Sequence, residues 1–148
     1  MSERKPAPSS AKQRSLPPLP DIVLEPIVKL ALAEDLGVAG DVTTDAIIDP
    51  EATGRWVVHA RKAGVVAGLD AATLAAWLID PEIQFSVSAP DGAAVKGGAT
   101  ICEISGSTRS VLMAERTMLN FIGRLSGVAT LTRMYVDAVA GMGVIIAS

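Results

Sequence analysis

The sequence has few of the residues that build disulfides, metal sites or base-stacking surfaces. Cys102 is the only cysteine and His59 the only histidine among 148 residues, so the chain contains neither a disulfide pair nor a Cys/His zinc motif. Aromatic residues make up 3% of the chain, too few for a surface that stacks bases. The apolar core must therefore come mainly from Ala, Val, Leu and Ile.

An excess of basic residues and long apolar runs are also absent. The net charge is −3, but residues 1–20 carry four basic residues and one acidic residue, which leaves −6 for the remainder. This acidic balance does not fit a partner with a phosphate backbone, so we expect no nucleic-acid binding. No apolar run is long enough to span a membrane, and the N-terminus has no hydrophobic signal region, so we expect a cytoplasmic protein without a membrane partner.

Three regions are predicted along the chain. Residues 1–20 hold five of the nine prolines, which lack a backbone donor and fix φ, so a disordered tail is expected there. Residues 21–127 have the mixed helix and strand patterns of one α/β domain. Residues 128–148 are the predicted start of a second domain, because the apolar run at 144–147 is typical of a strand buried on both faces. No sequence follows to cover that strand, so a truncated chain is expected.

The pattern of apolar residues and of turn and cap residues predicts an α+β protein. Helices are predicted over residues 21–36, 70–78, 108–125 and 129–140, with a break between the last two at Gly127. Strands are predicted over residues 55–61, 65–68, 83–87 and 100–105, with a further short strand between turns at 91–92 and 96–98. The first two strands, joined by a turn at 62–64, are expected to form a hairpin. Asp21, Asp70 and Thr108 are the predicted N-caps.

The helix predicted over residues 108–125 contains the strongest candidate for a ligand contact. Arg116 and Asn120 lie one turn apart on this mostly apolar helix, and Gly123 and Gly127 continue the same stripe. The stripe suggests close approach of a ligand or another subunit, and a guanidinium binds carboxylate or phosphate oxygens in pairs. An internal ion pair, with Glu115 or Glu103, explains Arg116 equally well.

Other polar residues favour structural interpretations. His59 lies in a predicted strand with no second histidine or cysteine nearby, and Cys102 lies in an apolar run typical of a buried thiol. Glu34 and Asp35 are neighbours on a helix and point in different directions, and capping is the simpler role for Asp35. No phosphate loop of the Walker or dinucleotide type is present.

Four stretches of the sequence form a recognisable series. They are LAEDLG with GDVTT at 32–37 and 40–44, RKAGVVAG at 61–68, the segment 91–98, and AERTMLNFI with LSGVAT at 114–122 and 125–130. In this order and spacing they resemble the N-terminal half of the quinolinate phosphoribosyltransferase family, over residues 25–148. The Glu-Arg-x-x-x-Asn block followed by Ser-Gly-x-Ala-Thr is the most specific part.

The resemblance implies an N-terminal α/β sandwich domain, linking helices and the first strand of a truncated α/β barrel. It implies transfer of a phosphoribosyl group from phosphoribosyl pyrophosphate to quinolinate, with Mg²⁺, to give nicotinate mononucleotide, CO₂ and pyrophosphate for NAD biosynthesis. It also implies a homodimer or higher homo-oligomer. In that assembly Arg116 would reach the quinolinate site of the neighbouring subunit, with Asn120 and Ser126 as further substrate-binding residues.

The family's later catalytic blocks, beginning with Thr-Arg-Lys-Thr-x-Pro-Gly, do not occur in these 148 residues. The chain alone is therefore expected to have no catalytic residue, to bind no metal and to be inactive, with apolar surface exposed on residues 129–147. Two alternatives remain open at this point. One is a molybdenum-transport-associated relative of the same fold, and the other is a non-catalytic interaction module.

Overall fold

The computed structural model describes residues 19–37, 44, 47–144 and 146. The predicted tail up to residue 18 and most of the turn predicted at 40–44 lie outside these residues. The helices and strands, in chain order, are α1 (Asp21–Leu36), β1 (Thr53–His59), β2 (Gly64–Val65), α3 (Leu69–Ile79), β3 (Gln84–Val87), β4 (Ala94–Val95), β5 (Thr100–Ser107) and α4 (Thr108–Ala138). The predicted mixture of helices and strands is confirmed.

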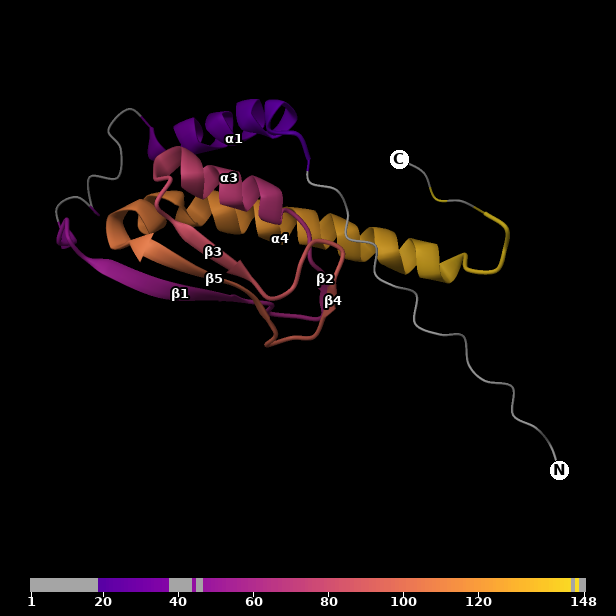
Figure 1. Ribbon diagram of the computed structural model, residues 1–148. Helices are drawn as coiled ribbons and strands as arrows, with labels where there is room; N and C mark the ends of the chain where they lie inside the picture. The colour runs from indigo at the N-terminus through magenta and orange to yellow at the C-terminus, as the bar shows by residue number, and fades with distance from the viewer. Residues whose placement is uncertain (1–18, 38–43, 45–46, 145, 147–148) are drawn as a thin grey trace.

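The elements form layers with the helices on one side of a small sheet (Figure 1). Strands β1, β5 and β3 make a three-stranded antiparallel sheet in the order β1-β5-β3, and β2 pairs with β4 in a separate two-stranded sheet. α3 and α4 lie against the three-stranded sheet, and α1 packs on α3 and α4. The longest helix, α4, runs along both sheets and extends beyond them toward the C-terminus.

Alternation along β1 and β5 explains why these segments form strands. In β1, Arg55, Val57 and His59 are exposed, whereas Trp56 and Val58 face Ile104 and Cys102 of β5 and pack against the core. The register shifts between Val58 and His59, so the alternation is interrupted in β5. Ile101 and Cys102, although neighbours, are both buried as a result.

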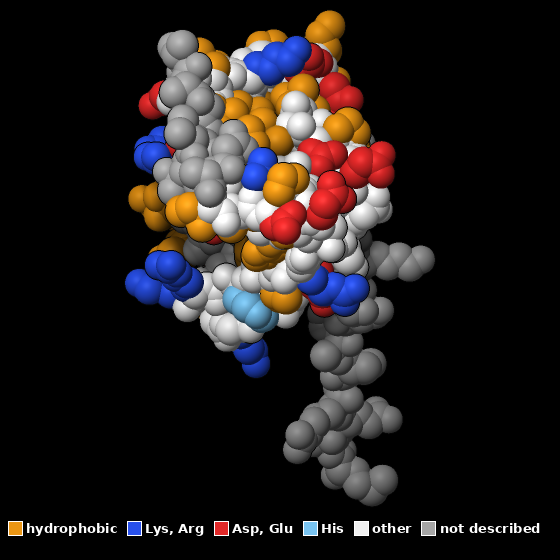
Figure 2. Space-filling view, turned by 90° about the vertical axis from the view of Figure 1, so that its left-hand side faces the viewer, with side chains coloured by type: hydrophobic (Ala, Val, Ile, Leu, Met, Phe, Trp, Pro, Cys, Tyr) orange, Lys and Arg blue, Asp and Glu red, His pale blue; other side chains and the backbone are white. Residues whose placement is uncertain are grey.

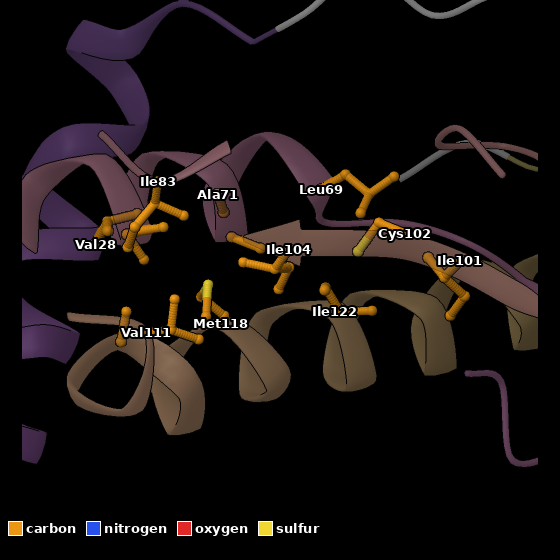
Figure 3. Close-up of a cluster of buried hydrophobic side chains, with 14 of the residues drawn as sticks. Val28, Leu69, Ala71, Ile83, Ile101, Cys102, Ile104, Val111, Met118 and Ile122 are labelled. Atoms are coloured by element: carbon orange, nitrogen blue, oxygen red, sulfur yellow. The ribbon is translucent and has the colours of Figure 1, made fainter. Parts of the chain in front are cut away.

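The core lies between β5, α3 and the first half of α4 (Figure 3). Ala71, Ala72, Ala75 and Ala76 of α3 are at most 2% exposed, and their small side chains let neighbouring elements approach closely. Cys102 is fully buried within this core, and burial raises the pKa of its thiol to about 11. The predicted structural role of this cysteine is therefore confirmed.

The predicted helix break at Gly127 is wrong, because α4 continues without interruption from Thr108 to Ala138. An interior glycine costs a helix only about 1 kcal/mol relative to alanine, so it does not by itself end one. The hydrogen bonds of a helix already anchored in the core are sufficient to carry it through Gly123 and Gly127. The boundary predicted between residues 127 and 128 thus falls inside a single helix.

The predicted hairpin between the first two strands is also wrong. β2 pairs with β4, through Gly64 with Val95 and Val65 with Ala94, rather than with β1. β1 instead has β5 as its partner along its whole length. The pairing of β2 is fixed by contacts with α4, described below, and these contacts lie far away in the sequence.

The helix starts are displaced by one or two residues from the predicted N-caps. Pro20 precedes α1, Gly68 precedes α3 and Ser107 precedes α4, where the Ser107 hydroxyl accepts from the backbone N–H of Ser110 at 3.5 Å. At α3 the capping carboxylate comes from a distant loop, because Asp91 accepts from the N–H groups of Gly68 and Leu69 at 3.0 and 3.2 Å. Asp70, the predicted cap, accepts from the N–H of Leu19.

The strand predicted at 144–147 is only partly within the described residues. Val144 and Ile146 are not in a strand and are 58% and 44% exposed, whereas residues 145 and 147 lie outside the described part. A strand requires a neighbour for its backbone hydrogen bonds, and none of the described elements pairs with Val144 or Ile146.

Candidate functional site

Arg116 projects from the first half of α4 toward the end of α1. Its side chain is 78% exposed, and its Nη1 atom lies 3.0 Å from Oδ1 of Asp35, whose side chain is only 16% exposed. The sequence allowed either an anion-binding arginine or an internal ion pair, and the structure shows an ion pair made by a side chain that is largely exposed. The partner is neither of the two predicted glutamates.

Neither Glu103 nor Glu115 is paired with Arg116 in the structure. Glu103 of β5 lies 3.7 Å from Arg55 of β1 across the sheet, where both side chains are substantially exposed. Glu115 lines a small cavity of about 290 Å³ between β1 and α4, beside Trp56 and Met118. Neither residue competes for Arg116 in this structure.

Asp35 lies in the last turn of α1, a position that is unfavourable for an anion. The C-terminal end of a helix carries partial negative charge, and the last turn of α1 contains no basic residue to offset it. The backbone N–H of Gly37 bonds to the carbonyl of Ala33 at this helix end, and the capping role predicted for Asp35 stays a prediction because residues 38–43 lie outside the described part. Arg116 supplies the compensating positive charge from another helix.

Asn120 and Ser126, the other two predicted substrate-binding residues, line a groove of about 840 Å³ between α4 and residues 58–66. Arg116 is one turn before Asn120 and does not line the groove. The walls are mostly apolar, with Leu119, Ile122 and Met134 contributed by α4. His59, Arg61 and Lys62 lie at the same groove and give it a basic edge.

Two hydroxyls of α4 fasten the β2 segment along one wall of this groove. Ser126 Oγ accepts from the N–H of Ala67 at 3.0 Å and donates to the carbonyl of the same residue at 3.2 Å. Thr130 Oγ1 accepts from the N–H of Val65 at 2.8 Å. Because Ser126 and Thr130 are one helical turn apart, their hydroxyls are spaced to bond the N–H groups of Ala67 and Val65, two residues apart in the extended segment.

Two glycines make this close contact possible. A Cβ atom on Gly64 would lie 2.6 Å from Thr130 Oγ1, and one on Gly68 would lie 2.9 Å from the carbonyl oxygen of Phe121. The GVVAG and SGVAT segments are therefore complementary surfaces that hold β2 against α4. This gives Ser126 a structural role, and its contact with substrate remains a prediction.

Gly123 and Gly127, unlike Gly64 and Gly68, have open space where a side chain would be. A Cβ atom added to either would meet nothing within 4 Å, so internal packing does not require a glycine at either position. The close approach predicted for this stripe would therefore have to come from outside the described residues. That approach remains a prediction.

His59 behaves as a surface residue, as predicted. It is exposed at the end of β1, and its Nδ1 atom lies 3.4 Å from the hydroxyl of Thr100. Figure 2 shows the histidine side chain at the surface, with Lys and Arg side chains around it in that view. Its contribution to the groove is thus a polar side chain at the edge.

The described residues do not form a metal centre. No group of three or more His, Cys, Asp and Glu side chains among them is arranged to hold an ion. These residues therefore do not fit the Mg²⁺ that the resemblance implies for a complete enzyme, and we assign no step to a metal on them. None of the described helices combines the length and apolar character needed to cross a bilayer.

Sequence reasoning missed Asp35 and Asp91 as key carboxylates. Both lie within the stretches that carry the family resemblance, at 32–37 and 91–98, and that membership was the available signal. Their partners lie on other elements, so spacing alone could not reveal them.

Known proteins are similar to this chain in sequence and in fold. The family model for the N-terminal domain of quinolinate phosphoribosyl transferase matches residues 41–126. The probable nicotinate-nucleotide pyrophosphorylase (carboxylating) of Synechocystis is 39% identical over 131 residues, covering 88% of this chain and 43% of the relative. The chloroplastic nicotinate-nucleotide pyrophosphorylase of Arabidopsis thaliana is 38% identical over 122 residues, covering 82% of this chain and 35% of the relative.

Solved structures give the same result. NadC from Streptococcus pyogenes superposes with a TM-score of 0.80 at 36% identity, covering 84% of this chain and 44% of that one. The nicotinate-nucleotide pyrophosphorylase of Francisella tularensis superposes with a TM-score of 0.77 at 34% identity, covering 82% and 42%. The chain thus spans less than half the length of the relatives it matches.

Proposed function

The chain belongs to the quinolinate phosphoribosyltransferase family, and we propose that it supplies the N-terminal domain for phosphoribosyl transfer to quinolinate in NAD biosynthesis. In this proposal phosphoribosyl pyrophosphate is the donor, and nicotinate mononucleotide, CO₂ and pyrophosphate are the products. Relatives that align with most of this chain are named nicotinate-nucleotide pyrophosphorylase or quinolinate phosphoribosyltransferase.

The observation that carries the proposal is that Arg116 is both exposed and held by an ion pair. Its guanidinium is 78% exposed yet anchored at one nitrogen by a largely buried carboxylate. Quinolinate is a dianion with planar carboxylates, which match the fork of an arginine. We assign Arg116 to quinolinate binding across the interface of a homodimer in the cytoplasm, with Asn120 and Ser126 as lesser candidates.

In this proposal the part of this domain is to bind and orient the substrate through Arg116, and no cluster among the described residues is suited to Mg²⁺. An arginine that fixes one carboxylate of quinolinate limits the orientations in which its ring nitrogen meets the ribose carbon. Such positioning lowers the barrier without any proton transfer by the arginine itself.

The test is steady-state formation of nicotinate mononucleotide by the native protein, purified at its natural length, with Arg116→Ala compared with wild type. We expect the KM for quinolinate to rise about 10- to 100-fold, as for loss of a charged hydrogen bond, with little change in the KM for phosphoribosyl pyrophosphate. Arg133→Ala is the matched control, because Arg133 is an exposed arginine of the same helix paired with Asp137 at 3.0 Å.

An unchanged KM for quinolinate in Arg116→Ala would contradict this assignment. Failure of the wild-type protein to form nicotinate mononucleotide would instead favour the molybdenum-transport-associated alternative or a non-catalytic module. One observation favours the module: the second half of α4 exposes Val128, Leu131 and Met134 at 63%, 52% and 64%.

A further inference from the structure

We propose that Asp35 is a positioning residue that fixes the guanidinium of Arg116 for quinolinate before the substrate arrives. The inference rests on the proposed function of Arg116 and deepens it. The two residues lie on different helices, and their ion pair links the end of α1 to the exposed stripe of α4.

The two partners differ sharply in freedom. Asp35 has a short side chain, is 16% exposed and lies on a regular helix packed against α3 and α4, so its carboxylate has few alternative positions. Arg116 is long and 78% exposed, and an unrestrained arginine of this kind samples many rotamers. The short, fixed partner therefore determines where the long one points.

The geometry leaves the guanidinium able to bind a second anion. Asp35 takes Nη1, and among the described residues no further hydrogen bond engages the Nε and Nη2 atoms of Arg116. A guanidinium offers five donors in one plane, so a substrate carboxylate can bind the remaining edge while Asp35 holds the first. The entropy of ordering the side chain is then lost on folding rather than on substrate binding.

The location of Asp35 argues against a role in stabilising α1. An anion in the last turn of a helix opposes the helix dipole, and Glu34 already places a second carboxylate there. An ion pair that only stabilised the fold would be better placed elsewhere on α1. Holding Arg116 explains the presence of a carboxylate at this position.

Asp35 also carries negative charge close to the proposed site for a dianion. It could therefore weaken quinolinate binding by repulsion, which is the alternative to a positioning role. If its charge mainly repels quinolinate, neutralising it would lower the KM for quinolinate. If it positions Arg116, neutralising it would raise that KM. The sign of the change therefore decides between the two roles.

The experiment is a double-mutant cycle of Asp35→Asn and Arg116→Ala in the native protein, with quinolinate and phosphoribosyl pyrophosphate as substrates. We expect Asp35→Asn alone to raise the KM for quinolinate about 2- to 10-fold, the equivalent of ordering one flexible side chain, and to leave the KM for phosphoribosyl pyrophosphate unchanged. In the Arg116→Ala background, Asp35→Asn should have no further effect, since a positioning residue acts only through its partner. Glu34→Gln, one residue away on the same turn, should behave as wild type.

The failures of the two proposals are distinguishable. If Arg116→Ala leaves the KM for quinolinate unchanged, the proposed function of Arg116 is wrong. If Arg116→Ala raises it but Asp35→Asn leaves it unchanged, lowers it, or adds its full effect to Arg116→Ala, the positioning role alone is overturned.

A measurement on the unmodified protein keeps the inference testable if Asp35→Asn does not fold. In ¹⁵N NMR spectra, a restrained guanidinium gives separate Nη signals with slow rotation about the Nε–Cζ bond. We expect slow rotation for Arg116 and fast rotation for Arg124, an exposed arginine of the same helix. Rotation as fast at Arg116 as at Arg124 would overturn the proposal.

Discussion

The two halves of α4 belong to one continuous helix but are held in different ways. In the first half, Val111, Met118 and Ile122 are at most 4% exposed and form part of the core. In the second half, Leu131 and Met134 are more than half exposed, and the hydroxyls of Ser126 and Thr130 hydrogen-bond to the β2 segment.

The comparison shows that one helix can be held by two kinds of interaction: apolar burial in its first half and side-chain hydrogen bonds in its second half. The first half is stabilised by apolar area removed from water, which is insensitive to direction. The second half is held by directional polar contacts to β2, so it depends on exact spacing of hydroxyls and glycines. Each half should therefore respond to a different kind of substitution.

The largest contrast is expected from truncating one large side chain in each half. Met118 is 1% exposed, so Met118→Ala should lower the free energy of unfolding by about 2–5 kcal/mol through lost burial and a new cavity. Leu131 is 52% exposed, so Leu131→Ala should change it by no more than about 0.5 kcal/mol. Urea unfolding with a common m-value measures both, and equal losses would refute the division of α4 into two halves.

A second contrast concerns two glycines with similar positive φ angles. Gly68 has φ +98° and its missing Cβ would lie 2.9 Å from the Phe121 carbonyl oxygen, so Gly68→Ala should cost about 1–3 kcal/mol from strain and more from that contact. Gly98 has φ +85° and nothing within 4 Å, so Gly98→Ala measures strain alone. Thermal unfolding of both variants isolates the contact with α4. If the two lose equal stability, close approach at Gly68 contributes nothing.

Much of the fold could be predicted locally, because helix and strand patterns depend on neighbouring residues. The bounds of α1 agree with the prediction, and β5 differs only by two residues at its end. What could not be predicted depends on contacts between distant segments. The pairing of β2 with β4 and the cap that Asp91 gives α3 both join parts of the chain whose spacing carries no signal.

The candidate site divides in the same way. The stripe of Arg116, Asn120 and Gly127 follows from helical periodicity, and the structure places all three on α4. The partner of Arg116 did not follow, since Asp35 lies on another helix and its position in a last turn suggested capping instead. Sequence patterns thus reveal which side chains share a face, whereas the structure reveals what that face touches.

A third prediction tests the polar attachment of the second half. Ser126→Ala leaves the N–H of Ala67 without its acceptor, which should cost about 1–3 kcal/mol of stability. Thr132→Ala, an exposed hydroxyl of the same helix, is the control and should be neutral. If Ser126→Ala raises the KM for quinolinate without loss of stability, the hydroxyl acts on substrate rather than on β2.

The smallest effect is expected at Gly127, and it has the opposite sign. Because an added Cβ meets nothing within 4 Å, Gly127→Ala should stabilise the domain by about 0.5–1 kcal/mol, the usual gain from replacing an exposed helical glycine. Thermal unfolding at one protein concentration measures this gain, and a loss of stability would mean that the helix needs glycine here for internal reasons. A gain in stability combined with weaker self-association or a higher KM for quinolinate would locate the need for glycine outside the domain. That combination is what the predicted close approach of another subunit requires, because only an external surface would then meet the new methyl group.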